Sequence, residues 1–153
     1  MLISKNGIDF IKSFEGLRLT AYQCQAGIWT IGYGHTRNVK QGDAITKEQA
    51  EELLKSDICP IAQLLEKWLK KNQIELEQNE YDAVFSLVFN IGMNNFIGSS
   101  VAKYIIQRRE KVTIANAFLL WNKIRKNGNL VISNGLVIRR KKERALFLDN
   151  NYN

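Results

Sequence analysis

The chain has 153 residues, 45% of them apolar and 24% charged, a composition typical of a globular domain and unlike that of a disordered chain. Its net charge of +7 favours an anionic partner, such as nucleic acid, an acidic membrane surface or a cell-wall polymer, without choosing among them. No segment approaches the length of about 20 consecutive apolar residues that a membrane-spanning helix needs, so we predict no such helix.

The cysteines and the histidine indicate neither a metal site nor a disulfide framework. Cys24 and Cys59 are the only cysteines and His35 is the only histidine, a set that lacks ordinary zinc-ligand spacing. We therefore expect no cofactor and reduced thiols, although a bridge between the two cysteines stays open. The first 16 residues contain no uninterrupted apolar run of signal length, so we expect a soluble, cytoplasmic chain.

The first third of the chain predicts a helix followed by a small sheet. Apolar residues recur at three-residue steps within residues 4–14 and Gly16 follows, which predicts a short amphipathic helix with Glu15 at its C-terminal end. Residues 17–39 are rich in Thr, Tyr, Trp and Ile and are punctuated by glycines. This stretch predicts two or three short antiparallel strands.

The rest of the chain predicts helices. Thr46 and Gln49 form a capping box at the start of a helix that Pro60 either kinks or replaces with a new, linking helix over 61–71. Residues 81–92 are apolar almost all round, which is typical of a buried central helix that ends at Gly92. Further helices are predicted over 99–109, 113–124 and 136–148, with a loop over 127–135.

This order of elements predicts the fold class. One helix, a small sheet and then helices alone indicate an α+β protein, with a small N-terminal lobe over 1–59 and a larger helical lobe over 60–153 within a single domain. A cleft between the two lobes is where we expect a long substrate to bind.

Three separated blocks of sequence carry a resemblance to a known family. The chain reads F-E-G-L-R-L-T-A-Y from Phe14, then Cys24, then G-I-W-T-I-G-Y-G-H-T up to Thr36. This pattern, together with residues 78–92 and 135–148, resembles the phage lysozymes, glycoside hydrolases with a lysozyme-like α+β fold. The resemblance covers nearly the whole chain and implies a muramidase that cleaves the glycan strands of peptidoglycan.

The resemblance implies roles for three catalytic residues. Glu15 matches the general acid that protonates the leaving oxygen, a role that needs a carboxyl group kept protonated by its surroundings. Thr30 matches the residue that holds the attacking water. Cys24 stands where many members have Asp, and we interpret it as a functional substitute, either a thiolate base or a negative charge beneath the oxocarbenium ion. The alternative is that Cys24 has no catalytic role.

The resemblance also implies contacts with the sugar substrate. The candidates are His35, Phe89, Asn90, Ser99 or Ser100, and Arg139 or Arg140. One of the two arginines is expected to pair with Glu15. Each residue also has an ordinary interpretation, as a core residue, a helix-end hydrogen bonder or part of a solvated basic face, and His35 is expected mainly to organise the hairpin.

Three rival functions stay open. Cys24 and His35 are the residue types of a thiol peptidase acting on wall peptides. The basic segment RRKKER suggests a nucleic-acid-binding module, although no aromatic residues alternate with its charges. A catalytically inactive wall-binding relative is the third alternative. The stereochemical course is open too, since water directed by Cys24 and Thr30 gives inversion and attack by Cys24 gives retention.

The partners follow from the same resemblance. We expect peptidoglycan as substrate, a monomeric enzyme, no specific nucleic acid and no insertion into a membrane. Because the sequence shows no export signal, a phage holin is expected to release the enzyme from the host cytoplasm to the wall.

Overall fold

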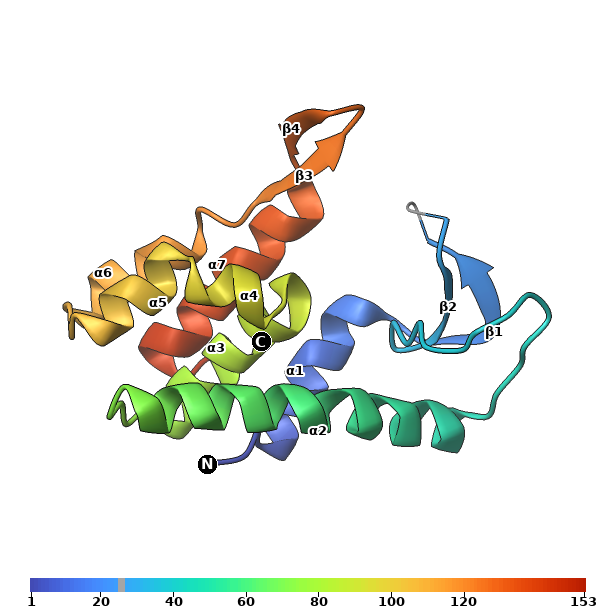
Figure 1. Cartoon of the computed structure of the whole chain (residues 1–153), viewed down its shortest axis with the longest axis horizontal. Helices are drawn as coiled ribbons and strands as arrows, with labels where there is room; N and C mark the ends of the chain where they lie inside the picture. Colours follow the sequence, from blue (N-terminus) through green and yellow to red (C-terminus); the bar gives the residue numbers. More distant parts are fainter. Residues whose placement is uncertain (25–26) are drawn as a thin grey trace. The chain divides into compact units, whose positions relative to one another are not determined.

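A computed structural model describes residues 1–24 and 27–153 and confirms the α+β class. The elements in chain order are α1 (Lys5–Glu15), β1 (Arg18–Gln23), β2 (Trp29–Gly32), α2 (Lys47–Lys71), α3 (Gln78–Ile91), α4 (Met93–Ile97), α5 (Ser100–Ile106), α6 (Lys111–Phe118), β3 (Lys123–Lys126), β4 (Asn129–Ile132) and α7 (Asn134–Asp149) (Figure 1). The strands form two separate two-stranded antiparallel sheets, β1–β2 and β3–β4.

The chain forms two compact units. Ile11–Ile61 makes up the small unit, and Met1–Phe10 together with Ala62–Asn153 makes up the large unit. The sequence predicts a lobe boundary after residue 59 and places the whole first helix in the smaller lobe. The structure instead divides α1 and α2 between the units, so that the first ten residues belong with the large unit.

The small unit contains the predicted sheet as a β1–β2 hairpin. Tyr22 pairs with Thr30 and Gln23 with Trp29, and the register is irregular between Arg18 and Tyr22. The tip of the hairpin at residues 25–26 lies outside the described residues. The capping box at the start of α2 is confirmed, since the Thr46 and Gln49 side chains each bond the other's backbone N–H.

The core of the large unit is α3, as the sequence predicts. Every residue from Tyr81 to Val88 is buried, and α3 packs against α7, which in turn packs against α6. Gly92 ends α3 at φ 83°, a backbone conformation that glycine adopts without steric cost. The continuous apolar run therefore reflects a helix enclosed by its neighbours.

Buried Asp82 holds the start of α1 and the C-terminus against α3. Its carboxylate accepts from the backbone N–H and the hydroxyl of Ser4, at 3.1 and 2.5 Å, and from the Tyr152 hydroxyl at 2.8 Å. Gly7 of α1 packs directly on this carboxylate, because a Cβ there would lie 2.6 Å from Asp82 Cγ. Ser4 also caps α1 by accepting from the Gly7 N–H.

The structure decides between the two alternatives at Pro60 and corrects two other predicted elements. The helix after the capping box continues through Pro60 as one element, so no new helix begins there. The helix predicted over 113–124 ends at Phe118, and its last residues form β3. The loop predicted over 127–135 contains β4, because Asn127 and Gly128 both have positive φ and build a two-residue hairpin turn.

Candidate active site

Glu15 is the last residue of α1, and its carboxylate lies against Gly34, in the turn that follows β2 in the small unit. Gly16, at φ 67°, ends the helix. A Cβ built on Gly34 would lie 3.2 Å from Glu15 Oε2, closer than side chains normally approach.

Thr30 lies in the middle of β2 with its hydroxyl held in one orientation. The residue is 4% exposed, and its Oγ1 donates a 3.0 Å hydrogen bond to the Ile28 carbonyl. The hydroxyl proton is thereby engaged, and the oxygen lone pairs stay available to accept from a water molecule. This is the chemistry expected of a residue that orients water.

The hairpin register places Cys24 on the same face as Thr30. The Cys24 N–H donates to the Ile28 carbonyl at 3.0 Å, which sets Cys24 opposite Ile28, and two positions earlier Tyr22 pairs with Thr30. Since side chains alternate between faces along a strand, Cys24 and Thr30 are diagonal neighbours on one face. Cys24 is half-buried and Cys59 is exposed.

His35 is buried, and both of its ring nitrogens have partners within the small unit. Nδ1 lies 2.8 Å from an Asp57 carboxylate oxygen, and Nε2 lies 3.0 Å from the Arg37 carbonyl oxygen. Its backbone exchanges two hydrogen bonds with Ile31, which closes the turn after β2. This arrangement gives His35 the expected organising role and leaves neither ring nitrogen for a sugar hydroxyl in this conformation.

A second cluster fixes the last turn of α1 against the turn that contains Gly34. The Lys12 ammonium donates to Glu51 Oε2 at 2.5 Å and lies 5.4 Å from the centre of the Tyr33 ring. The Tyr33 hydroxyl donates to the other Glu51 oxygen at 3.2 Å. Lys12 holds the pKa of the Glu51 carboxyl below its ordinary value. Through Glu51, the cluster therefore ties both the last turn of α1 and the turn that contains Gly34 to α2.

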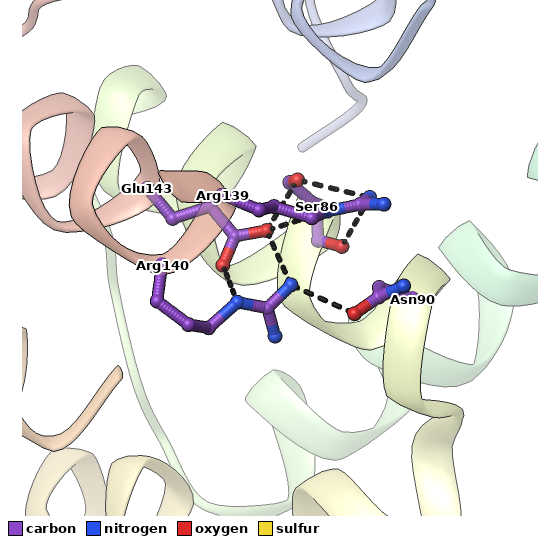
Figure 2. Close-up of polar contacts among 5 residues, drawn as sticks. All are labelled: Ser86, Asn90, Arg139, Arg140 and Glu143. Atoms are coloured by element: carbon purple, nitrogen blue, oxygen red, sulfur yellow. Dashed lines mark hydrogen bonds and ion pairs between the residues drawn. The ribbon is translucent and has the colours of Figure 1, made fainter. Parts of the chain in front are cut away.

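The two candidate arginines belong to a buried polar network in the large unit (Figure 2). Glu143 Oε1 accepts from Arg139 Nε at 3.1 Å, from Arg140 Nη2 at 3.1 Å and from the Ser86 hydroxyl at 2.7 Å. Arg140 also donates to Asn90 Oδ1 at 2.8 Å, and its Nε lies 2.9 Å from Glu143 Oε2. The network connects α3 to α7.

Burial dominates the electrostatics of this network. Arg140 and Glu143 are both fully buried. Burial lowers the pKa of Arg140 to about 10, against the opposing effect of Glu143, so the guanidinium stays charged at neutral pH. Burial likewise raises the pKa of Glu143, while the two arginines oppose the shift. The pair is therefore held together by mutual neutralisation inside the helical core.

The remaining sugar-contact candidates also lie in the large unit. Phe89 is half-buried near the end of α3, and Asn90 is exposed although its Oδ1 is bonded to Arg140. Ser99 is buried and caps α5 by accepting from the Ala102 N–H at 3.1 Å, and Ser100 begins that helix. Glu143 is not among the residues predicted from the sequence, although its spacing of four and three residues from the arginines is that of helix neighbours.

The comparisons with known proteins decide the family. The model of the phage lysozyme family matches residues 12–143, a span that includes Glu15, Cys24, Thr30 and the arginine network. The chain belongs to the phage lysozyme family. The enzyme is accordingly a glycoside hydrolase of the muramidase type. No cluster of three or more potential metal ligands occurs among the described residues of this lysozyme.

Similar proteins agree with this membership. The lysozyme is 48% identical over 147 residues to an endolysin of Acyrthosiphon pisum secondary endosymbiont phage 1, covering 96% of this chain and 98% of that protein. It is 41% identical over 153 residues to the endolysin of Salmonella phage P22, covering 97% and 99%. A solved endolysin from Escherichia coli O157:H7 phage FAHEc1 superposes with a TM-score of 0.93 at 41% identity, covering 100% of this chain and 97% of that one.

Proposed function

We propose that this lysozyme is an endolysin that hydrolyses the β-1,4 bond between N-acetylmuramic acid and N-acetylglucosamine, with Glu15 as its general acid. The observation that carries the proposal is the placement of Glu15 at the end of α1, against Gly34 and in the same unit as Cys24 and Thr30. Membership of the phage lysozyme family supplies the substrate class, peptidoglycan.

The proposed reaction proceeds by displacement with water. Glu15 gives its proton to the glycosidic oxygen as the bond to the anomeric carbon breaks. The Thr30 oxygen accepts a hydrogen bond from the water that attacks the anomeric carbon from the opposite side. Cys24, on the same hairpin face, acts as a thiolate that either takes the proton of that water and becomes a thiol or stabilises the developing positive charge. Water attack from the opposite side gives inversion of the anomeric centre.

Replacing Cys24 separates this mechanism from a thiol peptidase. We expect Cys24→Asp to keep muramidase activity within about tenfold of the unmodified enzyme, because a carboxylate supplies the same base or charge, whereas Cys24→Ala should lose about 10²-fold. The measurement is the rate of reducing-end formation on purified peptidoglycan. Complete loss of activity in Cys24→Asp, with peptide bonds cleaved by the unmodified enzyme, would contradict the proposal.

The surroundings of His35 also weigh against a thiol peptidase. A Cys–His dyad needs one imidazole nitrogen directed at the sulfur while the other is held by an orienting group. Here Asp57 holds Nδ1 and the Arg37 carbonyl holds Nε2. The imidazole would have to break one of these contacts before it could accept a proton from Cys24.

Two glycines with the same backbone conformation test whether the Glu15 position matters. Gly34 has φ 85° and Gly42 has φ 88°, so Gly→Ala should cost each position about 1 kcal/mol or more of stability through backbone strain. Only the Gly34 methyl group would meet the Glu15 carboxylate, because nothing lies within 4 Å of a Cβ at Gly42.

We therefore expect Gly34→Ala to lower kcat at least tenfold more than Gly42→Ala does, at similar losses of thermal stability. Turnover on purified peptidoglycan and the midpoint of thermal unfolding measure the two effects. Equal kcat values for the two variants would show that the proposed position of Glu15 has no catalytic importance.

The finer assignments remain predictions. Phe89, Asn90, Ser99 and Arg139 are proposed as sugar-binding residues on the family resemblance, and replacing each of them by alanine should raise KM.

No helix among the described residues combines the length and apolar character needed to cross a bilayer. Release from the host cytoplasm through a phage holin, and action as a monomer, are proposed on the same resemblance.

A further inference from the structure

The β3–β4 hairpin of the large unit carries cations and aliphatic side chains with no cover on either face. Every residue of Lys123–Lys126 and of Asn129–Ile132 is exposed. In Figure 1 the hairpin extends from the start of α7, away from α5 and α6 of the same unit. An isolated two-stranded hairpin gains little stability of its own, and this one is not packed into a core.

The register sorts the hairpin side chains into two faces. Lys123 pairs with Ile132, and Arg125 pairs with Leu130, so these four side chains share one face, which we call the cationic–aliphatic face. Leu130 and Ile132 are 63% and 64% exposed, whereas the aliphatic side chains of the opposite face are both 37% exposed. The two most exposed aliphatic side chains of the hairpin therefore lie directly beside Lys123 and Arg125.

The charge of this region is one-sided. Residues 111–142 contain eight Lys and Arg and no Asp or Glu, against a net charge of +7 for the whole chain. Glu143 is buried with two of these arginines, but the three hairpin cations Lys123, Arg125 and Lys126 are exposed. Because no carboxylate in the hairpin neutralises them, its partner should be anionic.

We propose that the β3–β4 hairpin docks the enzyme on the surface of an anionic phospholipid bilayer. Basic side chains attract anionic headgroups, while aliphatic side chains at the same face enter the boundary between headgroups and acyl chains. A polar polysaccharide or a nucleic acid would leave Leu130 and Ile132 in water, and the hairpin has no aromatic ring for stacking on bases. The inference is independent of the proposed catalytic mechanism.

Vesicle binding by the full-length protein tests the proposal with two complementary variants. Lys123→Gln/Arg125→Gln/Lys126→Gln removes the charges, and Leu130→Thr/Ile132→Thr removes the aliphatic surface while keeping residues that suit a strand. We expect binding to phosphatidylglycerol–phosphatidylethanolamine vesicles and none to phosphatidylcholine vesicles. The charge variant should bind these vesicles about 100-fold more weakly, since each cation contributes about fivefold in affinity. The threonine variant should bind them at least tenfold more weakly.

A charge-matched control distinguishes the hairpin from overall charge. Lys55→Gln/Lys67→Gln/Lys103→Gln removes three exposed lysines of α2 and α5 and should reduce binding far less. Equal losses in this control, or full binding by the threonine variant, would overturn the proposal. It would also be overturned if the hairpin variants kept vesicle binding and instead lost binding to purified peptidoglycan, which would assign the hairpin to the wall polymer.

Discussion

Replacing Glu15 by Gln should lower the rate of cell-wall clearing by about 10²- to 10⁴-fold, the range that a general acid contributes. The amide is nearly isosteric with the carboxyl group but cannot give a proton to the glycosidic oxygen. Because Gln keeps the size of the side chain that packs against Gly34, the midpoint of thermal unfolding should change little. Turbidity of a peptidoglycan suspension measures the rate.

The matched control is Glu52→Gln, an exposed glutamate of α2 in the same unit. It removes the same charge and should leave the clearing rate within about twofold, since surface substitutions of this kind seldom matter. A Glu15→Gln enzyme that cleared peptidoglycan as fast as the Glu52→Gln enzyme would show that the acid is another residue.

Replacing Glu143 by Ala should lower the free energy of unfolding by about 3–5 kcal/mol, the cost of removing one partner from a buried ion pair. The substitution leaves Arg140 without its buried counter-charge and removes the carboxylate oxygen that accepts from Arg139 and from the Ser86 hydroxyl. Arg140 is fully buried, and a guanidinium keeps its proton in proteins, so Arg140 cannot escape the penalty by becoming neutral. Urea unfolding monitored by circular dichroism measures the loss.

Two comparisons make this prediction specific to the network. Arg144→Ala removes a more exposed hydrogen bond to Asn116 from the same helix and should cost less than about 1 kcal/mol. The double variant Glu143→Leu/Arg140→Leu should recover much of the loss, because it removes the opposite charges together. A loss below about 1 kcal/mol for Glu143→Ala would mean that the network contributes little to stability.

The sequence was most informative where one pattern fixed one structure. The enclosed run in α3, the capping box at Thr46 and the glycine after Glu15 each depend on neighbouring residues alone, and each prediction is confirmed. The β3–β4 hairpin was missed because the apolar residues from Leu119 to Trp121 extend a helical pattern past the end of α6. Asn127 and Gly128 were the signal for the hairpin, since that pair strongly favours a two-residue turn.

The sequence predicts a set of candidate site residues but does not predict the contacts that hold them in place. The spacing of Glu15, Cys24 and Thr30 follows the family pattern, and the structure places all three in one unit. The partnership of His35 with Asp57 joins residues 22 positions apart on different elements, and no local pattern announces it. Such partners depend on tertiary packing, which a single sequence does not display.

The most direct test of the central claim is the chemistry of the products released from purified peptidoglycan. Mass spectrometry after sodium borohydride reduction distinguishes new reducing sugar ends from new peptide termini. The proposed muramidase should produce reduced N-acetylmuramic acid ends with the unmodified enzyme and none with Glu15→Gln, while every peptide bond stays intact. New peptide termini, or reducing ends that persist in Glu15→Gln, would contradict it.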